Sequence, residues 1–179
     1  RATAAGNITI SVGGGNSSGL LTGTNVQAGE DLTVDAGAFA GSVNIKAMTA
    51  SGSIILNAGD SGAFSGQDVI AKGDITFDSS GVNAGATADI LLNNISGSGA
   101  VTISLGNHEG VFSGDSIVGG NVTVAADNYA GTLDLSTITA SGNLIISAGT
   151  LGDFSGNNID VAGDFTFTNA ANTAKTADI

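Results

Sequence analysis

The chain of 179 residues contains no cysteine, no proline and no tryptophan. Without cysteine it can form no disulfide, no zinc–thiolate site and no thiol nucleophile. Its 29 glycines come without proline, which excludes a collagen-like chain because collagen needs both residues in a strict three-residue period. Glycine at this abundance is instead typical of many tight turns between short elements.

Basic residues are nearly absent. Lys46, Lys72, Lys175 and Arg1 face 16 acidic residues, so the formal net charge is −12. A chain this acidic has almost no means of neutralising phosphates, which excludes nucleic acid and an anionic membrane surface as partners. No apolar run approaches the roughly 20 residues of a membrane-spanning helix.

What the chain does contain is a repeated strand that starts with glycine. The eight starts are Gly6, Gly29, Gly52, Gly73, Gly99, Gly120, Gly142 and Gly163, which lie 23, 23, 21, 26, 21, 22 and 21 residues apart by subtraction. A recurring interval of this size is typical of proteins in which one structural unit stacks on the next.

Within each repeated strand, apolar residues alternate with polar ones. If the glycine is counted as the first residue, seven copies carry apolar residues at the third and fifth positions, as in Ile8 and Ile10. The copy at Gly29 has one more residue, so that Leu32 and Val34 take these places. This alternation predicts half-buried strands. The residue between the two apolar positions is expected to face outward, and in order these residues are Thr9, Thr33, Ile55, Thr76, Thr102, Thr123, Ile145 and Thr166.

Two kinds of coil alternate along the chain. One kind carries a Phe-Ser-Gly turn, at Phe64, Phe112 and Phe154, with a looser copy at Leu21; the other carries sequences such as Ala130-Gly-Thr-Leu-Asp-Leu135. The unit is therefore a pair of coils, and its four copies span approximately residues 6–51, 52–98, 99–141 and 142–179 of a single domain, 1–179.

These patterns predict an all-β fold, a parallel β-solenoid (β-helix) of about eight coils with roughly 22 residues each. Equivalent side chains should then form columns along the axis. Phe64, Phe112, Phe154 and Leu21 are predicted to share one interior column at every second coil, and the glycines are expected to supply positive φ and close approach at the corners. A second column is predicted from Val26, Val69, Ile117 and Ile159.

The two ends of the chain complement each other. Residues 163–179 give 17 residues of a last coil, and residues 1–5 would bring it to 22, a normal length for this chain. A bare solenoid end exposes unpaired strand edges and apolar side chains, and no segment that caps either end is evident. We expect the ends to meet further coils, either of a longer array or of a neighbouring copy that stacks head to tail.

The candidates for chemistry are few. Asp74 and Asp78 flank one strand, and Asp31 and Asp35 flank another, in the manner of paired acids in glycan-cleaving enzymes. The chain has one tyrosine, no tryptophan and its only arginine at the terminus, so it has few side chains of the kinds that line a sugar groove. The only histidine, His108, lies in a turn without further metal ligands. We therefore expect no enzyme, no cofactor and no metal site, although incidental calcium binding stays open.

The outward-facing threonines allow a second hypothesis. Regular threonine arrays occur on ice-binding solenoids, so this rank could form a binding module for ice or glycan. Threonine also simply suits exposed strand positions, and the ranks on either side are mixed.

The stretch Gly142-Asn-Leu-Ile-Ile-Ser-Ala-Gly149, with Asn158-Ile-Asp-Val-Ala-Gly-Asp-Phe-Thr-Phe167 after it, resembles the repeats of filamentous-haemagglutinin-like bacterial exoproteins and of other repetitive bacterial surface proteins. The chain departs from them in its longer coils, its Phe-Ser-Gly turn and its two-coil alternation. The resemblance implies an extracellular or surface-displayed structural rod, such as a fibre, matrix filament or adhesin shaft. The partners it implies are copies of the chain itself and host or matrix glycans.

Overall fold

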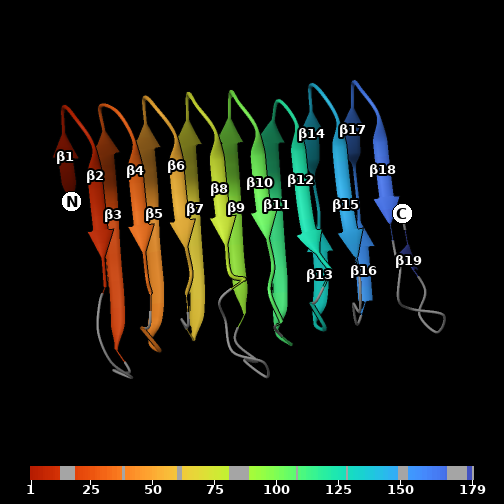
Figure 1. Ribbon diagram of the computed structural model, residues 1–179, viewed down its shortest axis with the longest axis horizontal. Helices are drawn as coiled ribbons and strands as arrows, with labels where there is room; N and C mark the ends of the chain where they lie inside the picture. The colour runs from red at the N-terminus through yellow and green to blue at the C-terminus, as the bar shows by residue number, and fades with distance from the viewer. Residues whose placement is uncertain are drawn as a thin grey trace.

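The computed structural model describes residues 1–12, 19–37, 39–59, 62–80, 89–107, 109–127, 129–148, 153–168 and 177–178. Every regular element among them is a β-strand, and every strand pair is parallel. The chain winds coil after coil along one long axis, so that its two ends lie at opposite ends of the molecule (Figure 1). The predicted parallel β-solenoid is thus confirmed.

The eight glycine-started strands form one sheet, and its strands are neighbours in the order of the sequence. They are short because a glycine turn precedes each one and the chain leaves the sheet after four or five residues. The strands are β2 (Ile8–Ser11), β4 (Leu32–Asp35), β6 (Ile54–Asn57), β8 (Ile75–Asp78), β10 (Val101–Ser104), β12 (Val122–Ala126), β15 (Leu144–Ala148) and β18 (Phe165–Thr168).

A second sheet of eleven strands forms the rest of the wall. Five of its strands are about twice as long as those of the first sheet, and in the later coils the long strand is divided in two. They are β1 (Ala2–Ala4), β3 (Leu20–Ala28), β5 (Ser42–Ala50), β7 (Ala63–Ala71), β9 (Ile90–Gly97), β11 (Val111–Gly119), β13 (Thr132–Leu135), β14 (Ile138–Ala140), β16 (Asp153–Gly156), β17 (Ile159–Val161) and β19 (Ala177–Asp178).

The solenoid has about seven stacked coils rather than the eight expected from the glycine count. Eight strands of the short-strand sheet enclose only seven complete windings between the first and the last. β1 and β2 are a partial coil, which pairs on one side only, with β3 and β4. Counting strand starts therefore overestimates the number of closed coils by one.

Each of the five long strands bends at one residue with a left-handed backbone, and one further such residue lies between β16 and β17. These residues are Asn25, Ala47, Asp68, Asn94, Ser116 and Asn158, with φ between 52 and 57°. Asn and Asp tolerate this region better than most residues, and a bend here turns the wall from one face of the coil to the next. The expectation that glycines supply positive φ at the corners was wrong for most of them: among the described glycines only Gly37 and Gly59 have it.

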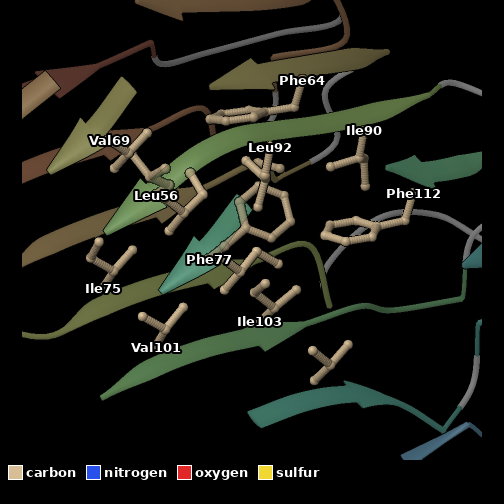
Figure 2. Close-up of a cluster of buried hydrophobic side chains, with 14 of the residues drawn as sticks. Leu56, Phe64, Val69, Ile75, Phe77, Ile90, Leu92, Val101, Ile103 and Phe112 are labelled. Carbon is tan, nitrogen blue, oxygen red and sulfur yellow. The ribbon is translucent and has the colours of Figure 1, made fainter. Parts of the chain in front are cut away.

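The core is a set of columns, as predicted. Strand register places Phe64, Phe112 and Phe154 in one column, separated by Ile90 and Leu133, and all five side chains are buried. Val69, Ile117 and Ile159 likewise alternate with other aliphatic residues in the next column. Figure 2 shows Phe64, Phe77 and Phe112 among aliphatic side chains of neighbouring coils, such as Leu56, Ile90 and Leu92. The ring centroids of Phe64 and Phe77 are 5.2 Å apart in an edge-to-face arrangement, which is favourable for aromatic pairs.

The alternation of two coil types has a packing cause. In the coils that carry Phe64, Phe112 or Phe154, a glycine follows two residues after the phenylalanine. The intervening coils carry two branched residues at these two places, such as Leu133 and Leu135. A β-carbon added at Gly114 would lie 3.0 Å from Phe112 Cε1 and 3.0 Å from Leu135 Cδ2. The phenylalanine ring thus fills the space beside its own glycine, and every coil keeps a similar core volume.

Candidate functional site

The two pairs of acids singled out in the sequence do not form catalytic pairs. A strand rises about 3.3 Å per residue, so the partners of each pair lie roughly 13 Å apart, beyond the separation that glycosidases use. Each carboxylate also accepts a local hydrogen bond. Asp31 Oδ1 accepts from the Ser53 N–H (2.7 Å), and Asp74 Oδ1 accepts from the Ala100 N–H (2.8 Å). Asp35 and Asp78 close turns after their strands by accepting from Gly37 and Ser80.

No group of three or more metal-ligating side chains exists within the described ranges of the chain. His108 lies outside the described residues.

A polar ladder follows the turns that precede the short strands. A side-chain oxygen of one coil accepts a hydrogen bond from the backbone N–H at the same position of the next coil: Asn7 from Asp31 (2.8 Å), Ser53 from Asp74 (3.2 Å) and Asn143 from Asp164 (2.9 Å) are examples. We call this column the turn ladder; its members are Asn7, Asp31, Ser53, Asp74, Ala100, Asn121, Asn143 and Asp164. The sequence placed most of these residues in an outward rank without a role.

The turn ladder explains the glycine at the start of most of the repeated strands, although at Gly29 and Gly120 the nearest atom is a backbone carbonyl oxygen, that of Ala5 or Gly99. At Gly52, Gly99 and Gly142 a β-carbon would collide with the Oδ1 atom of the ladder residue in the preceding coil. None of these glycines has a positive φ. The glycines are needed for close approach, because the ladder oxygen occupies the space of their missing side chain.

Ala100 is the one ladder member without an acceptor, so we expect Ala100→Asn to stabilise the protein. The new amide oxygen can accept from the Asn121 N–H, and Gly120 leaves the space that it needs. One added hydrogen bond is worth about 0.5 to 1.5 kcal/mol, which a thermal melt followed by circular dichroism would register as an increase in Tm. Ala100→Leu adds a side chain of similar size without an acceptor and should give no such gain.

The outward threonines form one column, as predicted. Register pairs Thr76 with Thr102 and Thr102 with Thr123, and the same column contains Thr9, Thr33 and Thr166. Ile55 and Ile145 interrupt it, with exposed fractions of 45% and 42%. We call this set the threonine column. Its longest uninterrupted run is three residues.

A buried tyrosine closes the core beside the long strands. Tyr129 is fully buried, and its hydroxyl donates a hydrogen bond to the Gly110 carbonyl (2.7 Å). Phe39 lies at the equivalent place two repeats earlier, against Gly19 and Gly41. Burial, and secondarily the nearby Asp89 carboxylate, raise the pKa of Tyr129 well above its ordinary value. The phenol therefore stays protonated while the chain is folded.

This raised pKa predicts a loss of stability in alkali. The unfolded phenol ionises near pH 10, so the contribution of the neutral phenol is complete below about pH 10 and decreases as the pH rises above it. Because Tyr129 is the only tyrosine, phenolate absorbance reports on it alone. We expect no phenolate signal from the folded chain at about pH 11, and a signal on unfolding. Tyr129→Phe should flatten the alkaline dependence of Tm, and a folded chain with an ordinary phenolate titration would contradict the prediction.

The two ends of the solenoid expose the columns that are closed elsewhere. Leu144 and Ile146 are fully buried, but the next members of their columns, Phe165 and Phe167, are 41% exposed and half-buried. At the other end Ile8 and Ile10, the first members of the same two columns, are half-buried. Ala2 and Val12, outside these columns, are half-buried as well. Among the described residues nothing covers either end. We call these the N-end and C-end surfaces.

No protein-family model matches the chain, and no significant match is found among curated proteins or among solved structures. The described residues include no helix with the length and hydrophobicity needed to cross a membrane. Of the resemblance to filamentous-haemagglutinin-like repeats, the β-solenoid fold is what the coordinates bear out.

Proposed function

We propose that the chain is a structural, non-catalytic rod: a section of the shaft of an extracellular or cell-surface fibre, matrix filament or adhesin. The observation that carries this proposal is the unbroken stack of parallel strands from one end of the molecule to the other. Each coil hydrogen-bonds to both neighbours in two sheets, and the same aliphatic columns run through all of them. Such a stack resists bending and can lengthen by adding identical units.

The remaining surface supports a passive role. The carboxylates that line the turns are occupied as acceptors for the backbone of the next coil, so they stabilise the stack. The high negative charge keeps the sides of such rods apart. The proposed location outside a bacterial cell is supported by the repeat sequence of residues 142–167, which is similar to the repeats of bacterial exoproteins.

Antibodies raised against this span would test the proposal by immunogold labelling of intact cells of the source organism. We expect gold on the outer surface, arranged along threads or a continuous coat, with pre-immune serum as the control. Labelling that appears only after the cells are permeabilised would place the protein inside the cell and contradict the proposal.

A binding module is the second candidate, and the register of the threonine column is what favours it. Strands about 4.8 Å apart repeat the hydroxyl and methyl groups of Thr76, Thr102 and Thr123 at a regular spacing. The isoleucines on both sides of this run keep it short, so we rank it second.

Thermal hysteresis and retention on immobilised glycans would test the second candidate. Activity that disappears in Thr102→Lys and survives in Thr49→Lys, a matched change on an exposed threonine of β5, would support it. If the chain is inactive in both assays, the binding hypothesis is wrong and the threonine column is an ordinary outward-facing row of strand residues.

A further inference from the structure

We propose that the C-end surface binds the N-end surface of a second copy of this chain, so that β18 pairs with β2 and β17 pairs with β1 of the next copy. This inference rests on the proposed rod function and names the partner at its ends. In this arrangement Phe165, Thr166 and Phe167 lie over Ile8, Thr9 and Ile10. The register continues the pairing that each of these strands has with its neighbour inside the chain.

The first argument is that the same three strand edges are open at both ends. At the C-end, β17, β18 and β19 each have a single neighbour among the described strands. At the N-end the one-sided strands are β1, β2 and the first half of β3 (Leu20–Thr24, which pairs only with β5), and they occupy the same columns. Each end therefore offers the backbone groups and the apolar side chains that the other end lacks.

The second argument is the polarity of the turn ladder. Every ladder hydrogen bond runs from a backbone N–H to the side-chain oxygen of the coil before it. At the C-end the ladder finishes on the Asp164 carboxylate, and at the N-end it begins with the backbone N–H of Asn7. A head-to-tail contact brings this acceptor to this donor. Two copies meeting through identical ends would instead oppose acceptor to acceptor or donor to donor, which favours the head-to-tail contact alone.

The third argument is charge. Residues 1–12, the partial first coil, contain Arg1 and no acidic residue, with Glu30 of the next coil beside Gly6, whereas residues 153–168 contain Asp153, Asp160 and Asp164 and no basic residue. Contact between the two ends therefore brings the positive charge of Arg1 toward a coil that carries three carboxylates. The sides of the rod carry the remaining excess of acids, so lateral association is opposed while end-on association is favoured. Contacts of this kind do not close and propagate as a filament.

Light scattering of the 179-residue chain, made without added residues at either end, tests the proposal. We expect masses in multiples of 17.2 kDa that increase with concentration, and threads with an axial repeat of roughly 38 Å, for eight strand spacings of about 4.8 Å. A chain that remains monomeric up to its limit of solubility would overturn the inference.

The matched variants are Phe165→Lys and Ile145→Lys. Both residues are about equally exposed, at 41% and 42%, but Phe165 belongs to the C-end surface and Ile145 to the side of the rod. We expect Phe165→Lys to weaken association by about tenfold or more and Ile145→Lys to leave it unchanged. Ile8→Lys repeats the test from the opposite end, and circular dichroism checks that each variant is folded. Equal effects of Phe165→Lys and Ile145→Lys would overturn the inference.

Engineered cysteines test the register, since the natural chain has none. Stacked strands would bring residues 9 and 166 of adjacent copies to a Cα separation of about 4.8 Å, which suits a disulfide. Thr9→Cys with Thr166→Cys, oxidised by oxidised glutathione, should therefore give a ladder of linked multimers on a non-reducing gel. Thr9→Cys with Thr168→Cys is offset to roughly 8 Å and should link poorly. Equal ladders from both pairs would overturn the register.

Failure of this inference is distinguishable from failure of the rod function. A folded chain that never associates removes the self-contact but leaves a shaft whose further coils come from one continuous chain. Absence of the protein from the cell exterior, by immunogold labelling, removes the shaft itself.

Discussion

Gly142→Ala is expected to destabilise the protein by about 2 to 3 kcal/mol, whereas Gly120→Ala should cost less than about 1 kcal/mol. Both glycines begin a repeated strand and neither has a positive φ. At Gly142 the new methyl group would collide with Asn121 Oδ1, so the ladder bond from the Asn143 N–H must break or the turn must shift. At Gly120 the preceding ladder residue is Ala100, and the nearest atom is the Gly99 carbonyl oxygen at 3.0 Å.

Thermal melts by circular dichroism measure this difference. For a chain of this length 1 kcal/mol corresponds to roughly 2 to 4 °C in Tm, so Gly142→Ala should lower Tm by about 4 to 12 °C. Adding Ala100→Asn converts Gly120 into a position like Gly142, and the combination of Ala100→Asn with Gly120→Ala should cost far more than the sum of the single changes. Equal costs for Gly120→Ala and Gly142→Ala would show that these glycines serve the backbone conformation and not the ladder.

The solenoid could be predicted from the sequence because the residues of each column recur at a nearly constant interval along the chain. Once a glycine and the alternating residues after it recur, parallel stacking is the arrangement that places Phe64, Phe112 and Phe154 in one buried column, and the structure confirms it. The outward rank that became the threonine column was predictable for the same reason, since alternation within a strand fixes which face each residue takes.

The turn ladder is not evident from a single coil, because it joins residues about 22 positions apart. The sequence shows that Asn121 precedes a strand, but only the stack shows that its side chain faces the backbone of Asn143. For the same reason the prediction of positive φ is wrong for most of the glycines. The left-handed residues lie instead at Asn25, Asn94 and their equivalents within the long strands, where the alternation of buried residues shifts by one position, as between Ile45 and Met48 in β5. A column of Asn, Asp and Ser one residue after the repeated glycine is the signal that marks such a ladder.

Gly114→Leu is expected to be among the most destabilising single changes in the core, at about 3 kcal/mol, and Phe112→Leu should cost about 1 to 2 kcal/mol. The leucine at position 114 would compete with Ile117, 2.9 Å from its β-carbon, and with Leu135 and the ring of Phe112, both at 3.0 Å. Phe112→Leu alone leaves a cavity beside the glycine. Combined, the two changes recreate the pair Leu133 and Leu135 of the next coil, so the double variant should be at least about 2 kcal/mol more stable than the sum of the single effects predicts.

The control is Phe64→Leu with Gly114→Leu. These two residues lie in coils roughly 10 Å apart along the axis, so their effects should add. Denaturant midpoints for the four variants of each cycle, followed by circular dichroism, separate the outcomes. Coupling only in the Phe112 and Gly114 cycle would mean that a coil is free to distribute its core volume between two positions and must keep only the total. Additive behaviour in both cycles would mean that each position has its own size limit, and the alternation of coil types would then need a cause other than packing.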